Sequence, residues 1–139
     1  MIELLVEMCN FANVKLRIFM SKLDHKKNEL LQAIIKSIKS IKGNNIVSLN
    51  FTEIENSICD FFIICSGTSN THVKAIQENV RKKVQKSVKQ KPWHIEEDDA
   101  ANWILMDYSG IILHIFQEET RIFYSLEELW GDAKMISYK

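Results

Sequence analysis

The stretch that decides the fold runs from residue 103 to residue 117 and reads Trp-Ile-Leu-Met-Asp-Tyr-Ser-Gly-Ile-Ile-Leu-His-Ile-Phe-Gln. Two apolar segments flank Ser109-Gly110, and a two-residue loop that ends in glycine is typical of a tight β-hairpin. Because side chains alternate along a strand, this loop length puts six of them on one face of the hairpin. They are Trp103, Leu105, Asp107, Ile112, His114 and Phe116. A three-residue loop would shift the pairing and dissolve this face.

Hydrophobic periodicity predicts further helices and strands on both sides of this hairpin. The expected elements are a helix over 24–41, a strand over 46–51, a strand over 61–65 that is buried on both faces, a helix over 70–89, an acidic loop over 96–99, and a short final helix opened by a capping box over 125–128. This order predicts an α/β protein with a mixed β-sheet flanked by helices. We expect residues 20–139 to form one domain and residues 1–19 to be an extension outside its core.

The composition is that of a globular protein, with 46% hydrophobic and 26% charged residues among 139. No apolar run approaches the roughly 20 residues that a membrane span needs, so we expect no membrane partner. The three cysteines, Cys9, Cys59 and Cys65, are odd in number and lack metal-ligand spacing. Free thiols in a reducing compartment are therefore expected, and we predict a cytoplasmic protein.

The net charge of zero conceals two oppositely charged parts. Residues 1–91 hold 15 Lys and Arg against 8 Asp and Glu, a balance of +7, whereas residues 92–139 hold 3 against 10, a balance of −7. An acidic surface repels nucleic-acid phosphates and attracts basic proteins. The alternative is that the two parts simply neutralise each other within one fold.

Each candidate for chemistry has a plain structural alternative. The turn Gly67-Thr-Ser69 lies between a buried strand and a helix N-terminus, where a phosphate can bind backbone N–H groups, but it lacks the Lys and glycines of a P-loop, and a tight turn with Ser69 as the N-cap is favoured. Nucleotidyl transfer would need two or more carboxylates around metal ions, and Asp107 stands alone on its strand. Asp107 and His114 suggest an acid–base pair or, in the plainer interpretation, a polar pair that orients an interface.

Three other groups of residues are open to two interpretations. The acidic stretch with His94, Glu96, Asp98 and Asp99 contains ligand types for a metal ion but lacks ligand spacing, so a solvated loop is favoured. The helix with Lys74, Arg81, Lys82, Lys83, Lys86 and Lys89 suggests either an RNA contact or a charged solvent face. Trp93, Trp103 and Trp130 suit interface anchors and core positions alike.

Three segments carry a resemblance to a known family. They are Ile58-Cys-Asp-Phe-Phe-Ile-Ile-Cys-Ser-Gly-Thr-Ser-Asn-Thr-His-Val-Lys-Ala-Ile76, Trp103-Ile-Leu-Met-Asp107, and His114-Ile-Phe-Gln-Glu-Glu-Thr-Arg-Ile-Phe-Tyr-Ser-Leu-Glu-Glu-Leu-Trp130. In residue types and spacing together, the chain resembles the ribosomal silencing factor family, also called the Iojap family, over residues 24–133. It departs from the family pattern at Glu97, where a glycine is usual, and at Ser109-Gly110, where Gly-Asp is usual.

The resemblance implies a fold similar to nucleotidyltransferases without their catalytic carboxylates. It further implies binding to the large ribosomal subunit, through its protein number fourteen, at the face that meets the small subunit. Such binding would block subunit joining and repress translation, with RNA contact at most peripheral, no catalytic residue, no cofactor and no metal ion. Carried over by position, the partner-binding residues are Trp103, Leu105, Asp107, His114, Arg121, Tyr124 and Glu127. A homodimer is left open, and a nucleotide-binding or nucleotidyltransferase-like enzyme is the alternative.

Overall fold

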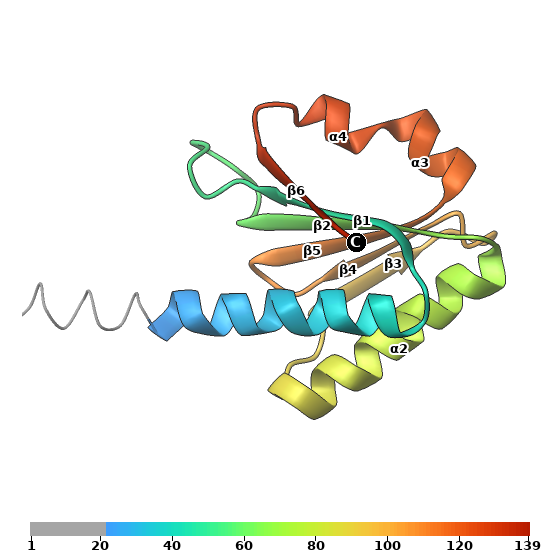
Figure 1. The fold of residues 1–139 in the computed structure, drawn as a ribbon, viewed down its shortest axis with the longest axis horizontal. Helices are drawn as coiled ribbons and strands as arrows, with labels where there is room; N and C mark the ends of the chain where they lie inside the picture. Colours follow the sequence, from blue (N-terminus) through green and yellow to red (C-terminus); the bar gives the residue numbers. More distant parts are fainter. Residues whose placement is uncertain (1–21) are drawn as a thin grey trace, which may run out of the picture.

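The computed structural model describes residues 22–139, which form a six-stranded mixed sheet between two layers of helices (Figure 1). The sheet order is β3-β4-β5-β2-β1-β6. The strands are β1 (Asn44–Asn50), β2 (Phe61–Gly67), β3 (His94–Glu97), β4 (Trp103–Asp107), β5 (Ile111–Gln117) and β6 (Lys134–Tyr138). A first helix covers residues 22–40, and α2 (Asn70–Val88), α3 (Glu118–Tyr124) and α4 (Leu126–Leu129) follow. Strands β2 and β5 are parallel, and every other neighbouring pair is antiparallel.

The two faces of the sheet carry two separate apolar cores. The first helix and α2 lie on one face (Figure 1), where Ile34, Ile38, Ile76 and Val80 are fully buried against the sheet. On the other face, α3 and α4 pack against a smaller core that contains Phe62, Phe116 and Leu126. Because α3 and α4 are short, they cover only part of this second face, and the hairpin residues at its β3–β4 edge are left partly exposed.

The hairpin forms in the expected register. Trp103 pairs with Phe116, Leu105 with His114 and Asp107 with Ile112. Ser109 takes the positive φ of 77° that a primed turn requires. Gly110 is needed for a close approach, because a Cβ at this position would lie 3.0 Å from Asp60 Oδ2.

Several other expectations are confirmed. The mixed α/β architecture is as predicted, and β2 is buried along almost its whole length. Ser69 caps α2, since its hydroxyl accepts a hydrogen bond from the backbone N–H of His72. Cys59 and Cys65 are free and buried, and burial raises the pKa of each thiol to about 12.

Within residues 22–139, no helix has the length and apolar character that crossing a membrane requires. Cys9 and the predicted extension 1–19 lie outside the described residues.

Four features differ from the prediction. The expected acidic loop over 96–99 is partly strand, because β3 runs to Glu97. Helix α3 and strand β6 were not expected. The prediction of a capping box at Ser125 is wrong. This residue has φ 42°, and its hydroxyl donates a hydrogen bond to Ile122 O of the preceding helix. Ser125 therefore ends α3 instead of capping α4 through its side chain.

Candidate protein-binding cleft

An open cleft of about 710 Å³ lies between the β3–β4 edge of the sheet and α3. Its apolar lining comes from Trp103 and Leu105 on β4 and from Phe123 and Tyr124 on α3. Its acidic lining comes from Glu96, Glu97, Asp98 and Glu119. Asn102 and Thr120 complete it. We refer to this feature as the acidic cleft; it combines apolar and aromatic side chains with four carboxylates.

Trp103 is half-buried and lines the cleft. Its ring lies 4.8 Å from the ring of Phe116 and 4.8 Å from that of Tyr124, measured between centroids, and those two rings are 6.5 Å apart. Asp98 holds the start of β4, because its Oδ1 accepts hydrogen bonds from the backbone N–H groups of Asn102 and Trp103. Trp103 is thus neither a free surface residue nor a full core residue, and its exposed part is positioned by rigid neighbours.

His114 hydrogen-bonds Trp103 and not Asp107, so the polar pair of Asp107 and His114 that the sequence suggested does not form. The indole Nε1 of Trp103 donates to His114 Nδ1 at 3.1 Å. The imidazole is buried beneath the cleft, 4.6 Å from the Phe62 ring, and its Nε2 has no partner among the described residues. Burial lowers the pKa of His114 from 6.5 to about 4, so the ring is neutral at physiological pH. The neutral, buried imidazole thus accepts the indole hydrogen bond and helps to fix the orientation of Trp103.

Asp107 belongs to the hairpin turn. Its Oδ1 accepts a hydrogen bond of 2.8 Å from the backbone N–H of Ser109, an arrangement that stabilises tight turns. The carboxylate remains partly exposed at the end of β4. It lies on the same face as Trp103 and Leu105, but it is not among the residues that line the acidic cleft.

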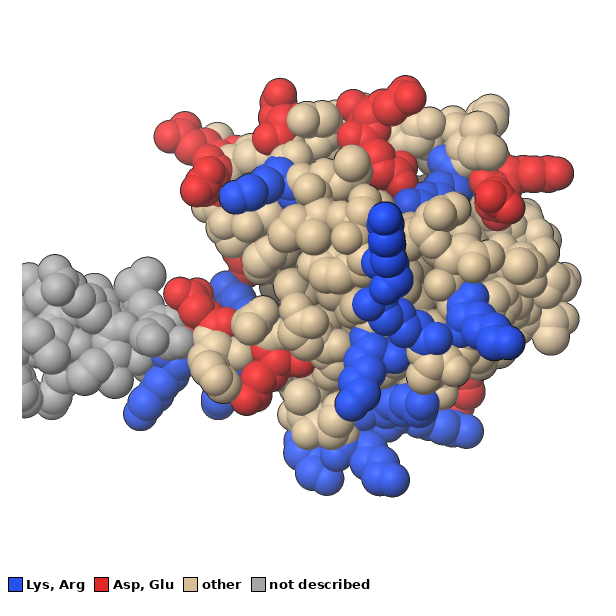
Figure 2. All heavy atoms as spheres, viewed as in Figure 1, with Lys and Arg blue, Asp and Glu red and all other residues tan. Residues whose placement is uncertain are grey.

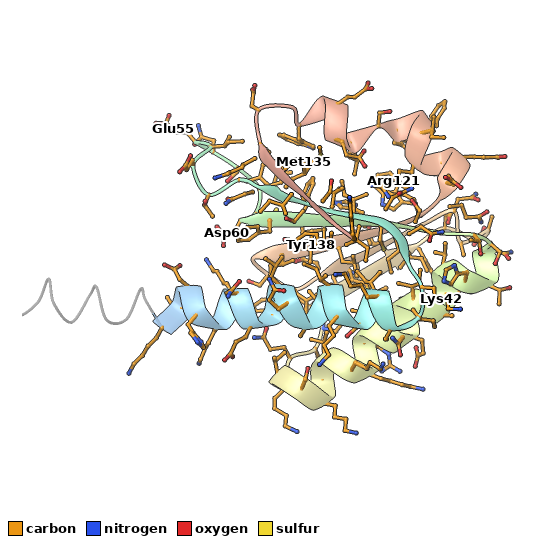
Figure 3. All side chains as sticks on the ribbon, in the orientation of Figure 1. Lys42, Glu55, Asp60, Arg121, Met135 and Tyr138 are labelled. Atoms are coloured by element: carbon orange, nitrogen blue, oxygen red, sulfur yellow. The ribbon has the colours of Figure 1, made fainter. Side chains whose placement is uncertain are left out.

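Arg121 and Glu127 form an internal ion pair between α3 and α4. The Arg121 guanidinium donates to Glu127 Oε1 at 2.7 and 2.8 Å and to Ser66 Oγ at 2.8 Å. The two side chains are only 12% and 23% exposed, and Figure 3 shows Arg121 between the short helices and the sheet. Their geometry holds α3 in place, and hence positions Phe123 and Tyr124 at the cleft.

The charges of the molecule are separated in space. Figure 2 shows Asp and Glu side chains gathered over α3, α4 and the β1–β2 loop, whereas Lys and Arg gather over the first helix and α2. On the face that Figure 2 shows, the described acidic and basic side chains thus gather mainly in different regions. The acidic cleft lies in the negative part of the chain.

The turn at Gly67-Thr-Ser69 is closed by the chain's own groups. The backbone N–H of Thr68 donates to His72 Nδ1 at 2.9 Å, and that of His72 donates to Ser69 Oγ at 3.1 Å. His72 Nε2 lies 2.8 Å from Ile41 O, which anchors the imidazole. A Cβ at Gly67 would approach Val73 Cγ2 to 2.9 Å, so this glycine serves helix packing. Two of the N–H groups that would hold a phosphate are thus already occupied.

Sequence reasoning missed part of the cleft. It did not single out Phe123, which is 80% exposed, or Glu119 on the unexpected helix α3. An apolar run Ile122-Phe-Tyr directly after charged residues was the available signal. Of the three tryptophans, Trp93 is exposed, while Trp130 packs against Phe51 and Phe62. Within residues 22–139, no group of three or more His, Cys, Asp or Glu side chains is placed to hold a metal ion.

The six-stranded mixed sheet, with short helices beside the hairpin face, defines an α/β protein of the Iojap architecture. Sequence comparison agrees, because the model of the family described as "Ribosomal silencing factor during starvation" matches residues 24–139. The chain belongs to this family of ribosomal silencing factors.

Individual relatives support the assignment. The chain is 36% identical over 111 residues to the ribosomal silencing factor of Halalkalibacterium halodurans, which covers 78% of this chain and 91% of that protein. A crystal structure from Bacillus halodurans has a TM-score of 0.67 at 32% identity and covers 80% of this chain and 99% of the other. One from Chromobacterium violaceum has a TM-score of 0.69 at 28% identity and covers 75% and 85%.

Proposed function

We propose that this protein represses translation in the cytoplasm by binding the large ribosomal subunit at the face that meets the small subunit. The acidic cleft would hold a basic segment of the subunit's protein number fourteen, and the bound protein would block subunit joining sterically, with no chemical reaction. The observation that carries the proposal is the cleft itself, in which Trp103, Phe123 and Tyr124 are surrounded by four carboxylates.

The chemistry of the cleft favours a basic protein segment. Aromatic side chains supply large contact areas and dominate the energy of many interfaces. Carboxylates at the rim attract Lys and Arg, raise the association rate and disfavour acidic competitors. Ribosomal proteins are typically basic, so their exposed segments complement the charge of this part of the chain.

The seven residues carried over from the family divide into two groups. Trp103, Leu105 and Tyr124 line the cleft and would contact the partner, with Asp107 as an adjacent charge. The other three, His114, Arg121 and Glu127, are mostly buried and would act by positioning the first group. Binding therefore depends on both the contact residues and their supports, but loss of a support should also lower the free energy of unfolding.

The nucleotide-binding alternative has less support. It relies on the Gly67–Ser69 turn, where His72 and Ser69 already accept backbone N–H groups. A nucleotide that binds the native state must raise the melting temperature. We expect no shift with a nucleoside triphosphate and Mg²⁺, and a clear rise would favour the alternative.

Co-sedimentation through a sucrose gradient with separated subunits tests the proposal. The protein should travel with large subunits and not with small ones. Phe123→Ala should weaken this binding at least tenfold, because an exposed aromatic anchor is removed with little effect on the core. Ile58→Ala is the matched control, since Ile58 is 74% exposed in the loop between β1 and β2 and outside the cleft. Equal binding by both variants would contradict the proposed site.

A further inference from the structure

A second charged surface lies on the opposite layer of the molecule, at the C-terminal half of α2. Residues 81–91 contain six Lys and Arg and no Asp or Glu. These six residues are exposed, and Figure 2 shows Lys and Arg side chains gathered over the region of α2. Glu78, one turn earlier, is the nearest acid on the helix, and it pairs with Arg81 and Lys82.

A shallow cleft opens within this basic surface. It has a volume of about 270 Å³ and lies between α2 and the segment that enters β3. Arg81 and Lys91 lie on its rim, and Pro92 and Ile95 supply its apolar side. The acidic cleft shares none of these residues, so the two sites are separate.

Trp93 follows Pro92, one of the residues that line this cleft, and is 81% exposed. Its backbone is held in place, because its N–H donates to Asp107 O at 2.7 Å. This mostly exposed indole follows Lys89 and Lys91 within four residues of sequence, and its exposure means that it contributes little to the core. Such a ring can stack on a nucleic-acid base, since every base has a π-face.

We propose that this basic corner, defined as Arg81, Lys82, Lys86, Lys89, Lys91 and Trp93, binds RNA. The cations contact backbone phosphates, and the Trp93 indole stacks on one unpaired base. Exposed aromatic rings and Lys or Arg side chains recognise single-stranded loops and bulges in this way. An acidic protein would also match the charge and could use the indole as an anchor, so it is the competing occupant that the experiment below separates from RNA. The inference goes beyond the proposed function, because this surface can bind RNA whether or not the acidic cleft binds a ribosomal protein.

Fluorescence anisotropy with a labelled RNA hairpin that carries an unpaired loop tests the inference on the full chain. Lys89→Gln/Lys91→Gln should lower the affinity about tenfold and reduce the slope of log K against log salt by about 1.4, or 0.7 for each lost phosphate contact to a single strand. Trp93→Ala should weaken binding by about 5- to 150-fold, the range for one lost stacking contact. Trp93→Phe should restore most of this loss.

A charge-matched control makes the result decisive. Lys134→Gln/Lys139→Gln removes two exposed lysines at β6 and should leave both the affinity and the salt slope unchanged. The inference is overturned if this control loses as much affinity as the test variant, or if Trp93→Ala binds the RNA as well as the parent. Tighter binding to poly-glutamate or to anionic lipid vesicles than to the RNA would also overturn it. Because all altered side chains are exposed, each variant should melt close to the parent temperature.

Discussion

The indole N–H of Trp103 donates a hydrogen bond to His114 Nδ1 across strands β4 and β5, at 3.1 Å. Because Nδ1 accepts, the neutral imidazole must carry its proton on Nε2. A protonated ring would have two donors and could no longer accept from the indole. The floor of the acidic cleft therefore depends on an uncharged His114.

Acid should destabilise the protein through His114. Its pKa is 6.5 in an exposed chain and about 4 when buried here, so the unfolded state binds more protons between these values. The free energy of unfolding should thus fall as the pH drops from about 6.5 to 4, by roughly 3 kcal/mol in total. Urea unfolding at a series of pH values measures this. In His114→Asn the pH dependence should be weaker by that amount; an unchanged dependence would contradict the assignment.

The Arg121–Glu127 pair should matter far more for stability than an exposed pair does. Arg121→Met leaves a partly buried Glu127 without its partner and Ser66 without a donor, which should cost about 2–4 kcal/mol of unfolding free energy. Arg81→Met breaks the exposed pair with Glu78 and should cost less than about 1 kcal/mol. If both variants lost the same free energy of unfolding in denaturant, the Arg121–Glu127 pair would be no more important for stability than the exposed pair.

Ser109→Gly should stabilise the hairpin. Ser109 holds φ at 77°, a conformation that costs a residue with a Cβ about 1 kcal/mol and costs glycine little. The variant should therefore melt a few degrees above the parent. Ser109→Ala keeps the Cβ and should not show this gain. A lower melting temperature for the glycine variant would mean that the serine hydroxyl makes an essential contact.

Asp107→Asn separates the charge of this residue from its structural role. The Asn side chain retains an oxygen that can accept from the Ser109 N–H, so the melting temperature should change little. Affinity for the large subunit should fall by about 3- to 10-fold at low salt, and the difference should shrink as salt rises. Titrations of parent and variant at two ionic strengths measure both effects. A deficit that is independent of salt would argue against a charge contact.

The hairpin and its register were predictable because local chemistry specifies them. A two-residue loop that ends in Gly110 leaves one way to pair the apolar segments, and the pairing of Leu105 with His114 follows. The long amphipathic helices were equally clear from their apolar stripes, and their observed positions, 22–40 and Asn70–Val88, are within a few residues of the prediction.

The missed elements are those whose stability comes from tertiary contacts. Strands β3 and β6 lie at the two edges of the sheet and are mostly exposed, so they lack the buried pattern of a typical strand. Helix α3 has no buried residue and is held by Arg121. The predicted pair of His114 and Asp107 is wrong for a related reason. Both residues lie on the same face of the hairpin, but the Asp107 carboxylate accepts a hydrogen bond from the Ser109 N–H, and the His114 imidazole accepts one from the Trp103 indole.

The central claim is that the bound protein prevents the subunits from joining, and light scattering during mixing of purified subunits measures this directly. With increasing protein, the fraction of joined ribosomes should fall and level off at one molecule per large subunit, with no nucleotide consumed. Phe123→Ala should need at least tenfold more protein for the same effect, and Ile58→Ala should match the parent. Unchanged joining at concentrations that saturate the large subunit would contradict the account.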